Sequence, residues 1–292
     1  KPFRSNQIVK FKYLIFSILF TFLILITFSF FVIANKGFEN RYPLYGKFNI
    51  DNLKYNEEVR MFKYEIGSPE FKDNTNQNKI LIFGNSHARD LFNIFILNKE
   101  LFSENQFSIL DGQVHCLIKI SDFKLCKKNL SSKSRNIFLD SEIFVISQDW
   151  TAQDIDNIDE ILKLLKRYNK KIVITSNHPD FYFKNSRNII DEFYMNNKRL
   201  PKKFEKVKLE KKKFNSENKR TKNINKFLKE YSKLNNIIYL DKKDFLCRKY
   251  QNRCYVLTED NNKIHIGGGH ITLSGAKFFG KLISSMDWFK LN

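Results

Sequence analysis

The chain has 292 residues, which is enough for one globular domain of about 200 residues plus attached segments. Its formal net charge of +20 would suit a nucleic acid or an anionic membrane as partner, but the lysines and arginines are spread along the whole chain. That spread is typical of a biased composition with solvated basic side chains. Because zinc-finger spacing and an aromatic RNP-like strand motif are both missing from the sequence, no nucleic-acid partner is predicted.

The N-terminal segment predicts one membrane-spanning helix. Residues 13–34 contain no charged side chain, and a helix of about 20 apolar residues crosses the hydrocarbon core of a bilayer. The basic residues before it are Lys1, Arg4, Lys10 and Lys12. The positive-inside bias therefore places residues 1–12 in the cytoplasm and everything after Asn35 outside. A cleaved signal peptide is the alternative, but residues 32–34, Val-Ile-Ala, fit the small-x-small cleavage pattern poorly.

Residues 35–78 are polar with scattered glycines and prolines, so we expect a tether with little regular structure. In residues 79–292, short apolar runs alternate with helical patterns. The runs, each short enough for a strand buried on both faces, are residues 79–83, 107–110, 142–146, 171–175 and 237–240. The clearest helical patterns are residues 88–99, 155–168 and 224–234. This alternation predicts an α/β fold with a parallel sheet covered on both sides and its site at the carboxyl ends of the strands.

Residues 181–215 interrupt the alternation, because this segment is longer than an ordinary connection and rich in lysine. We interpret it as an inserted basic arm or lid of the domain. Its lysines form a solvated face in the simpler interpretation, and lie against anionic lipid or an acidic polysaccharide in the alternative.

The four cysteines suit an oxidising compartment outside the cytoplasm. Cys116 and Cys126 are close in sequence, as are Cys247 and Cys254, so two short disulfide loops are the simplest of the three possible connectivities. Four unpaired thiols in the core are the alternative. Neither spacing is that of a zinc knuckle, and we expect no metal site.

Residues 84–87, Gly-Asn-Ser-His, lie directly after the first predicted strand and before the first predicted helix. Ser86 either caps this helix or serves as a nucleophile. A nucleophilic serine needs a base, usually histidine, and donors for the oxyanion, one of which would be its own backbone N–H in the first helical turn. His270 follows three glycines and precedes a helical pattern, so a loop would present it as that base; a capping or surface histidine is the alternative.

Both segments resemble blocks of the SGNH (GDSL-type) hydrolases. Residues 84–87 are similar to the first block, usually Gly-Asp-Ser, and residues 270–276, His-Ile-Thr-Leu-Ser-Gly-Ala, are similar to the last block, His-Leu-Ser-x-x-Gly-Ala. The resemblance implies a three-layer, flavodoxin-like α/β domain over residues 79–292. It also implies Ser86 as the nucleophile and His270 as the general base.

The acid that orients the histidine is missing from its usual place. The family usually has an Asp three residues before the histidine, and this chain has Gly267 there. Asp260, Glu259 or a backbone carbonyl could take over that role, or the serine and histidine could work as a dyad. By analogy with serine-protease triads, the loss of the carboxylate without a replacement could cost on the order of 10⁴-fold in rate.

The oxyanion donors also depart from the family pattern. The third block, normally Gly-x-Asn, has no match after the central strand, where Gln148 is the side chain that could donate to the oxyanion. Gly112, after the second strand, is the expected backbone donor of the second block, beside the N–H of Ser86.

The N-terminus carries a second resemblance. Residues 1–4, Lys-Pro-Phe-Arg, before a membrane span are similar to the Glu-Lys-Pro-Phe-Arg stretch before the last helices of acyltransferase family 3 membrane proteins. In one branch of that family an SGNH domain is attached outside the membrane, with two similar cysteine pairs and a Trp after the central strand, here Trp150. We therefore expect residues 1–12 to be the end of an acyltransferase motif, and the chain to be the C-terminal part of a longer membrane acyltransferase or a truncated remnant of one.

These resemblances imply an O-acyltransferase, usually an O-acetyltransferase, of the bacterial inner membrane with its globular domain in the periplasm. Ser86 would receive an acyl group that comes from cytoplasmic acyl-CoA through a membrane acyltransferase domain, and would pass it to a hydroxyl of a cell-surface glycan such as lipopolysaccharide. No bound cofactor is expected. Two alternatives stay open: an SGNH carbohydrate esterase or deacetylase that uses water, and an inactive module that binds a glycan or a partner.

Overall fold

A computed structural model of the chain describes residues 11–35, 67–73, 76–113, 124–125, 128–129, 131–179, 188–266, 269–286 and 288. The chain divides into an N-terminal unit that carries helix α1 and a larger unit that carries the α/β domain.

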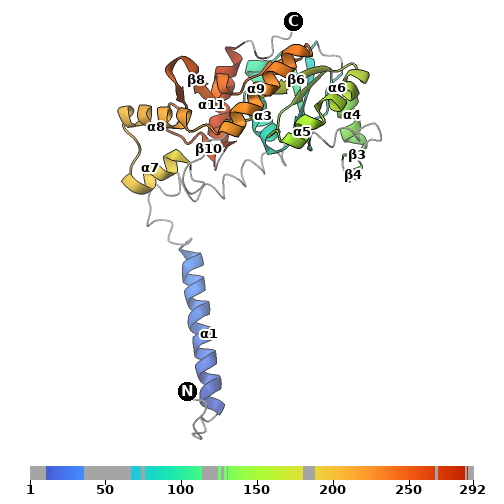
Figure 1. Cartoon of the computed structure of the whole chain (residues 1–292). Helices are drawn as coiled ribbons and strands as arrows, with labels where there is room; N and C mark the ends of the chain where they lie inside the picture. The colour runs from blue at the N-terminus through green and yellow to red at the C-terminus, as the bar shows by residue number, and fades with distance from the viewer. Residues whose placement is uncertain are drawn as a thin grey trace. The chain divides into compact units, whose positions relative to one another are not determined.

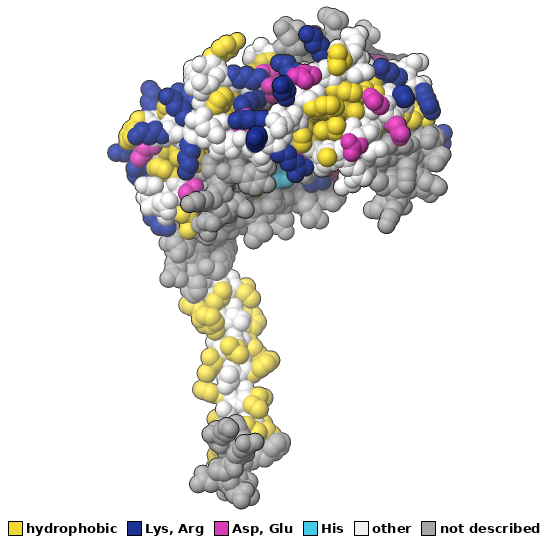
Figure 2. All heavy atoms as spheres, viewed as in Figure 1, with side chains coloured by type: hydrophobic (Ala, Val, Ile, Leu, Met, Phe, Trp, Pro, Cys, Tyr) yellow, Lys and Arg dark blue, Asp and Glu magenta, His cyan; other side chains and the backbone are white. Residues whose placement is uncertain are grey.

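Helix α1 (Phe11–Ala34) contains the predicted membrane span, Tyr13–Ala34, which is long and apolar enough to cross a bilayer and has none of its apolar window buried by protein. Figure 2 shows hydrophobic side chains along its visible face. Three of its hydroxyls are bonded within the helix: Thr21, Thr27 and Ser29 each donate to the carbonyl oxygen four residues earlier, at 2.7–2.9 Å. A hydroxyl that is bonded to its own helix can lie in lipid at little cost.

The core of the larger unit is a five-stranded sheet in which every neighbouring pair is parallel, as predicted. Its strands are β1 (Asn78–Gly84), β2 (Asn105–Asp111), β5 (Ile143–Ile146), β6 (Lys171–Thr175) and β7 (Ile238–Leu240). The spatial order is β2-β1-β5-β6-β7, so the chain steps outward from β1 in one direction and then in the other. In open α/β sheets this reversal creates a crevice at the carboxyl end of the strand where it occurs, and places the functional site there.

Helices cover both faces of the sheet and complete the three predicted layers (Figure 1). On one face, α3 (Ser86–Ile96) and α11 (Leu273–Ser284) pack against Ile80 and Ile82 of β1. On the other face, α4 (Ser132–Asp140), α6 (Ile158–Arg167) and α9 (Lys219–Leu234) pack against Leu81 and Phe83. Because successive side chains of a strand point to opposite faces, the continuous apolar run of β1 supplies both cores.

Shorter elements decorate the sheet. They are η3 (Lys99–Phe102), α5 (Ala152–Asp156), α7 (Ile189–Asn197), α8 (Lys203–Asn215), α10 (Lys243–Leu246) and η6 (Lys249–Gln251). Three antiparallel ribbons pair β3 (Lys124–Leu125) with β4 (Lys128–Asn129), β8 (Cys247–Arg248) with β9 (Arg253–Cys254), and β10 (His265–Ile266) with β11 (His270–Ile271). The ribbon of β10 and β11 brings His270 against α3.

The predicted disulfide between Cys247 and Cys254 is confirmed, and it joins β8 to β9. The other predicted pair, Cys116 with Cys126, lies outside the described residues, as do Gly267 and most of the predicted tether, 35–78.

Part of the predicted arm, residues 188–215, is described and forms α7 and α8. Buried polar contacts attach both helices to the domain: Asp191 receives two hydrogen bonds from the Lys263 ammonium, at 2.6 and 2.8 Å, and Glu210 accepts two from the Arg253 guanidinium, at 2.5 and 2.8 Å. The buried Lys213 ammonium on α8 hydrogen-bonds to His265 at 2.8 Å. Because a buried charge is tolerated only with a partner, these contacts fix where the two helices lie.

Four other lysines of α8 face outward. Lys203, Lys208, Lys211 and Lys212 are exposed, and dark-blue basic side chains gather over this part of the domain in Figure 2. The inward side of α8 is thus built from paired charges, and its outward side is the basic surface for which the sequence left two interpretations open.

Replacement of Gly84 by Ala is expected to destabilise the domain by about 3 kcal/mol. Gly84 has φ +150°, and a Cβ atom there would lie 2.0 Å from the carbonyl oxygen of Ser147 at the end of β5, so the two strands would have to separate. Thermal or denaturant unfolding measures the change. Gly269→Ala is the control, because its new Cβ would meet no atom closer than 3.5 Å, and equal losses in both variants would contradict the packing argument.

Asp191→Asn is expected to cost about 3–5 kcal/mol of unfolding free energy, because it leaves the Lys263 ammonium buried without its counter-charge. The double variant Asp191→Leu with Lys263→Met removes both charges and should recover most of that loss. Denaturant unfolding of the three chains measures both effects. A double variant as unstable as the single one would show that the ion pair itself stabilises the arm.

Candidate active site

Ser86 lies where the sheet topology places a functional site, at the carboxyl end of β1. It is the first residue of α3 and is half-buried. The N-cap of α3 is Asn85, whose side-chain oxygen accepts a hydrogen bond from the His87 N–H at 3.1 Å. Within the described part of the chain the Ser86 hydroxyl has no hydrogen-bond partner. The capping role that the sequence left open for Ser86 therefore belongs to its neighbour.

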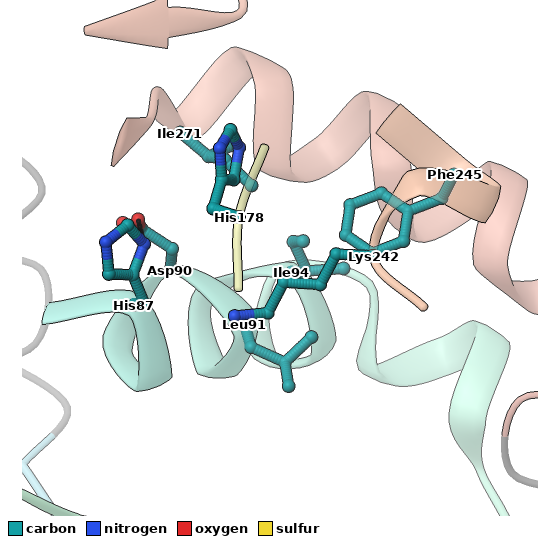
Figure 3. Close-up of a pocket in the computed structure, with 8 residues that line it drawn as sticks. All are labelled: His87, Asp90, Leu91, Ile94, His178, Lys242, Phe245 and Ile271. Carbon is teal, nitrogen blue, oxygen red and sulfur yellow. Dashed lines mark ion pairs between the residues drawn. The ribbon is translucent and has the colours of Figure 1, made fainter. Parts of the chain in front are cut away.

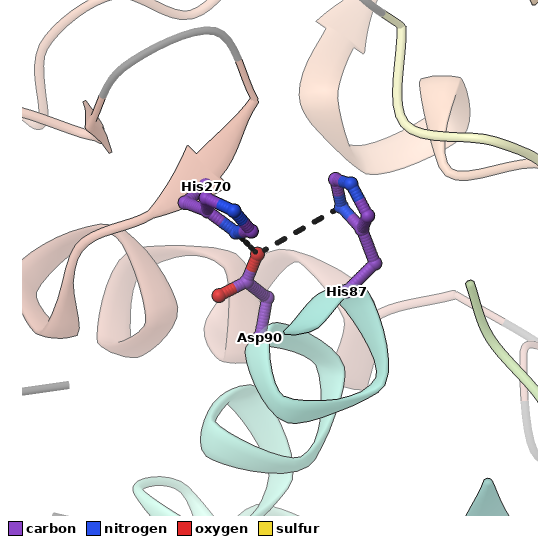
Figure 4. A group of neighbouring side chains, drawn as sticks. All are labelled: His87, Asp90 and His270. Atoms are coloured by element: carbon purple, nitrogen blue, oxygen red, sulfur yellow. Dashed lines mark hydrogen bonds and ion pairs between the residues drawn. The ribbon is translucent and has the colours of Figure 1, made fainter. Parts of the chain in front are cut away.

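His270 lies on β11 and meets α3 through a carboxylate. Its Nδ1 atom is 2.9 Å from Oδ2 of Asp90, and the contact joins residues 180 positions apart (Figure 4). Asp90 is buried, whereas the His270 side chain is 38% exposed. The carboxylate raises the pKa of His270 above its ordinary value of 6.5, against the opposing effect of burial. The hydrogen bond therefore stabilises the imidazolium, the form that a general base takes after it accepts a proton.

Asp90 was not among the site residues predicted from the sequence. One signal could have found it: Asp90 comes four residues after Ser86, and residues four apart lie on the same face of a helix. Asp260, which the sequence analysis named as the possible acid partner, lies in an exposed turn, and the structure joins Asp90 to His270 in its place. Sequence distance from the histidine was therefore a poor guide to its partner.

Three more histidine rings lie in a row of ring contacts that begins at His270. The His87 ring stacks on His270 with ring centroids 5.0 Å apart and on His178 at 5.9 Å, and His178 meets His265 edge to face at 5.3 Å. Burial lowers the pKa of His87, His178 and His265 well below 6.5, so these rings stay neutral at physiological pH. Among the histidines of the described segments, His270 alone has a raised pKa.

A small cavity opens beside these rings (Figure 3). It is lined by His87, Asp90, Leu91, Ile94, His178, Lys242, Phe245 and Ile271. The Lys242 side chain is buried, and within the described segments its ammonium has no hydrogen-bond partner. Burial lowers its pKa to about 8, while the charges of Asp90 and Asp149 oppose that change.

Gly112 and Gln148, the other two predicted oxyanion donors, differ from each other in their surroundings. The Gly112 N–H donates to the carbonyl oxygen of Gly84 at 2.9 Å, so it extends the β1–β2 ladder and is not a free donor, contrary to the sequence-based prediction. Gln148 is buried two residues after the end of β5, at the same edge of the sheet as Ser86. The preceding Ser147 hydroxyl donates to the carbonyl oxygen of His87 at 3.4 Å, which holds this segment against the start of α3.

His87, Asp90 and His270 could also ligate a metal ion, because one ligand atom from each lies within 4.8 Å of the others. Two features of the site favour a proton in that position. The shortest contact is already a hydrogen bond between Asp90 and His270, and the electrostatic effect of Lys242, which lowers the pKa of both imidazoles, opposes a further cation.

Comparison with known proteins identifies the family of the domain. The sequence model of the SGNH domain (fused to AT3 domains) matches residues 55–285. The chain belongs to this family. No curated protein matches the chain.

The periplasmic domain of a lipopolysaccharide acetyltransferase from Salmonella ser. Paratyphi A has the same fold as this SGNH domain. Its TM-score is 0.54 at 16% sequence identity, over 80% of this chain and 95% of that chain. A GDSL-like lipase from Bacteroides thetaiotaomicron is more distant, with a TM-score of 0.39 at 14% identity over 80% and 94% of the two chains. The three-layer SGNH fold predicted from the sequence is thus confirmed. The role of this family in general is acyl transfer or hydrolysis.

Asn85→Ala is expected to lower the unfolding free energy by about 1 kcal/mol, the usual cost of losing an N-cap. Ser86→Ala should change it by less than about 0.5 kcal/mol, because the serine hydroxyl caps nothing. Denaturant unfolding, followed by the fluorescence of the buried Trp150 and Trp288, measures both. A larger loss in Ser86→Ala than in Asn85→Ala would show that the serine is the structural residue of the pair.

Proposed function

We propose that the chain is an O-acyltransferase that passes an acyl group, most simply acetyl, to a hydroxyl of an extracytoplasmic glycan through an ester on Ser86. One observation carries the proposal: His270 reaches the nucleophile helix from the far end of the chain and hydrogen-bonds there to a residue one turn after Ser86. Two further observations support the proposal: the pKa of His270 is raised, and Ser86, whose hydroxyl has no hydrogen-bond partner among the described residues, begins the helix that carries Asp90.

The chemistry proceeds in two steps. Neutral His270 removes the hydroxyl proton of Ser86 as the serine oxygen attacks the carbonyl carbon of the acyl donor, and the imidazolium then protonates the leaving group. An ester remains on Ser86. In the second step His270 takes the proton of the acceptor hydroxyl, whose oxygen attacks the ester, and the serine leaves with that proton. The Ser86 N–H, at the start of α3, and the Gln148 amide are the proposed donors to the oxyanion of both steps.

The family, the fold and the N-terminal helix of the chain favour acyl transfer over hydrolysis. Its family is fused to AT3 domains, its fold is shared with a lipopolysaccharide acetyltransferase domain, and α1 has the length and composition of a membrane span. We therefore propose that the chain lies in the bacterial inner membrane with its SGNH domain in the periplasm. The acyl group would come from cytoplasmic acyl-CoA through a membrane AT3 domain, and the acceptor would be a surface polysaccharide, lipopolysaccharide or peptidoglycan.

Labelling of the detergent-solubilised chain with a fluorophosphonate probe tests for an activated serine. Wild type should label, Ser86→Ala should not, and His270→Ala should label at least about 100-fold more slowly, the contribution expected of a general base. Ser285→Ala, which removes a hydroxyl bonded only to its own helix end, is the matched control and should label normally. A folded wild type that does not react would instead favour an inactive glycan-binding module.

Transfer and hydrolysis are separated by the fate of the acyl group. The chain is loaded with p-nitrophenyl acetate in the presence of a lipopolysaccharide-derived oligosaccharide, and the products are identified by mass spectrometry. The proposal predicts an acetylated oligosaccharide that is absent with Ser86→Ala. Free acetate as the sole product, at a rate that the oligosaccharide does not change, would identify an esterase.

A further inference from the structure

Asp90 lies on α3, the helix that begins with Ser86, and hydrogen-bonds to His270. We propose that Asp90 is the positioning residue of His270, so that the acid of this site is carried by the nucleophile helix instead of the loop before the histidine. The inference rests on the proposed function of Ser86 and His270. It explains how the site retains a carboxylate although position 267 is glycine.

The contact fixes which nitrogen of His270 acts as the base. A carboxylate oxygen only accepts, so the 2.9 Å contact requires the proton of the neutral imidazole to be on Nδ1. The lone pair is then on Nε2, the nitrogen that is free to accept a proton from a hydroxyl. With the Asp90 side chain 5% exposed, water competes little for this hydrogen bond.

Helix α3 fixes the acid relative to the nucleophile. Ser86 and Asp90 are one helical turn apart, about 6 Å along the axis, and both move with the same backbone. The helix is itself held in the core, where Leu91, Phe92 and Phe95 are buried. A carboxylate on this helix is therefore placed more rigidly than one on a loop would be.

The charges around His270 are consistent with this role. Lys242 is the nearby buried cation, and its ammonium balances the Asp90 carboxylate, which would otherwise be a costly uncompensated charge. Arg89, two residues after His87 on α3, forms an ion pair with Asp111, with Nη2 and Oδ2 3.5 Å apart. Both Lys242 and Arg89 lower the pKa of His270, and the Asp90 hydrogen bond outweighs them.

His87 is the competing imidazole, since its Nδ1 atom is 3.9 Å from the same Asp90 oxygen. Burial, with the charges of Lys242 and His270, lowers its pKa well below 6.5. His178 stacks on His87 and is buried and neutral as well. A proton taken up by this group of rings therefore resides on His270, next to Asp90.

The test is the pH dependence of fluorophosphonate labelling of the full chain in detergent, from about pH 5 to pH 9. In wild type the labelling rate should rise with pH to a plateau, with a midpoint above 6.5, because the base works only when His270 is neutral. Asp90→Asn removes the charge that raises this pKa, so the midpoint should move to lower pH. The plateau should fall by about 10²–10⁴-fold, because the imidazole loses its orientation and the stabilisation of its cation.

Two further variants separate positioning from a general loss of structure. Asp90→Glu keeps the carboxylate and should recover part of the plateau and of the midpoint. Asp260→Asn removes an exposed carboxylate and should match wild type in both. A folded Asp90→Asn chain with an unchanged midpoint and plateau would overturn the inference, and so would an Asp260→Asn chain that reproduces the loss.

Histidine NMR gives a readout that is independent of activity. With ¹⁵N-labelled histidine, the signal of His270, identified by its absence in His270→Ala, should titrate above 6.5 in wild type and lower in Asp90→Asn. If Ser86→Ala and His270→Ala label as fast as wild type, the proposed function fails, whereas this titration still decides the contact. A wild-type His270 pKa at or below 6.5 would overturn the inference even if Asp90→Asn does not fold.

Discussion

The burial of β1 on both faces is the constraint on which the structure depends. Ile80 and Ile82 contribute to one core and Leu81 and Phe83 to the other, so helices must cover both sides of the sheet. The strand pairs with β2 on one side and with β5 on the other, which puts the reversal of strand order at its end. Ser86 lies at that end of β1, where open α/β sheets usually have their functional site.

The close contact of β1 and β5 at that end shapes the site. Gly84 lets the Ser147 carbonyl approach its Cα, and the chain then turns directly into α3 with Asn85 as the cap. A side chain at position 84 would push β5 and the following Gln148 away from the start of the helix. The same few residues thus join two strands and begin the helix whose first residue is Ser86.

Much of the fold followed from the pattern of apolar residues, and the misses have physical reasons. The five strands were found because each is a short apolar run bounded by polar residues, while α4 was missed because only Ile137 and Phe138 of its nine residues are buried. Helix α8 gave no clear period because both residues that it buries, Glu210 and Lys213, are charged. Hydrophobic periodicity does not register an ion pair whose second member lies elsewhere in the chain.

The sequence by itself determined the membrane-length apolar helix, the α/β sheet, the disulfide between Cys247 and Cys254, and the two blocks that contain Ser86 and His270. Each depends on residues that are near one another in the chain or on a pattern with a fixed period. Only the tertiary structure decided that Asp90 meets His270, because that contact joins residues 180 positions apart through the packing of β11 on α3. It also decided that the Gly112 N–H is taken up by the sheet, since backbone pairing between strands has no signature in the identity of a single residue.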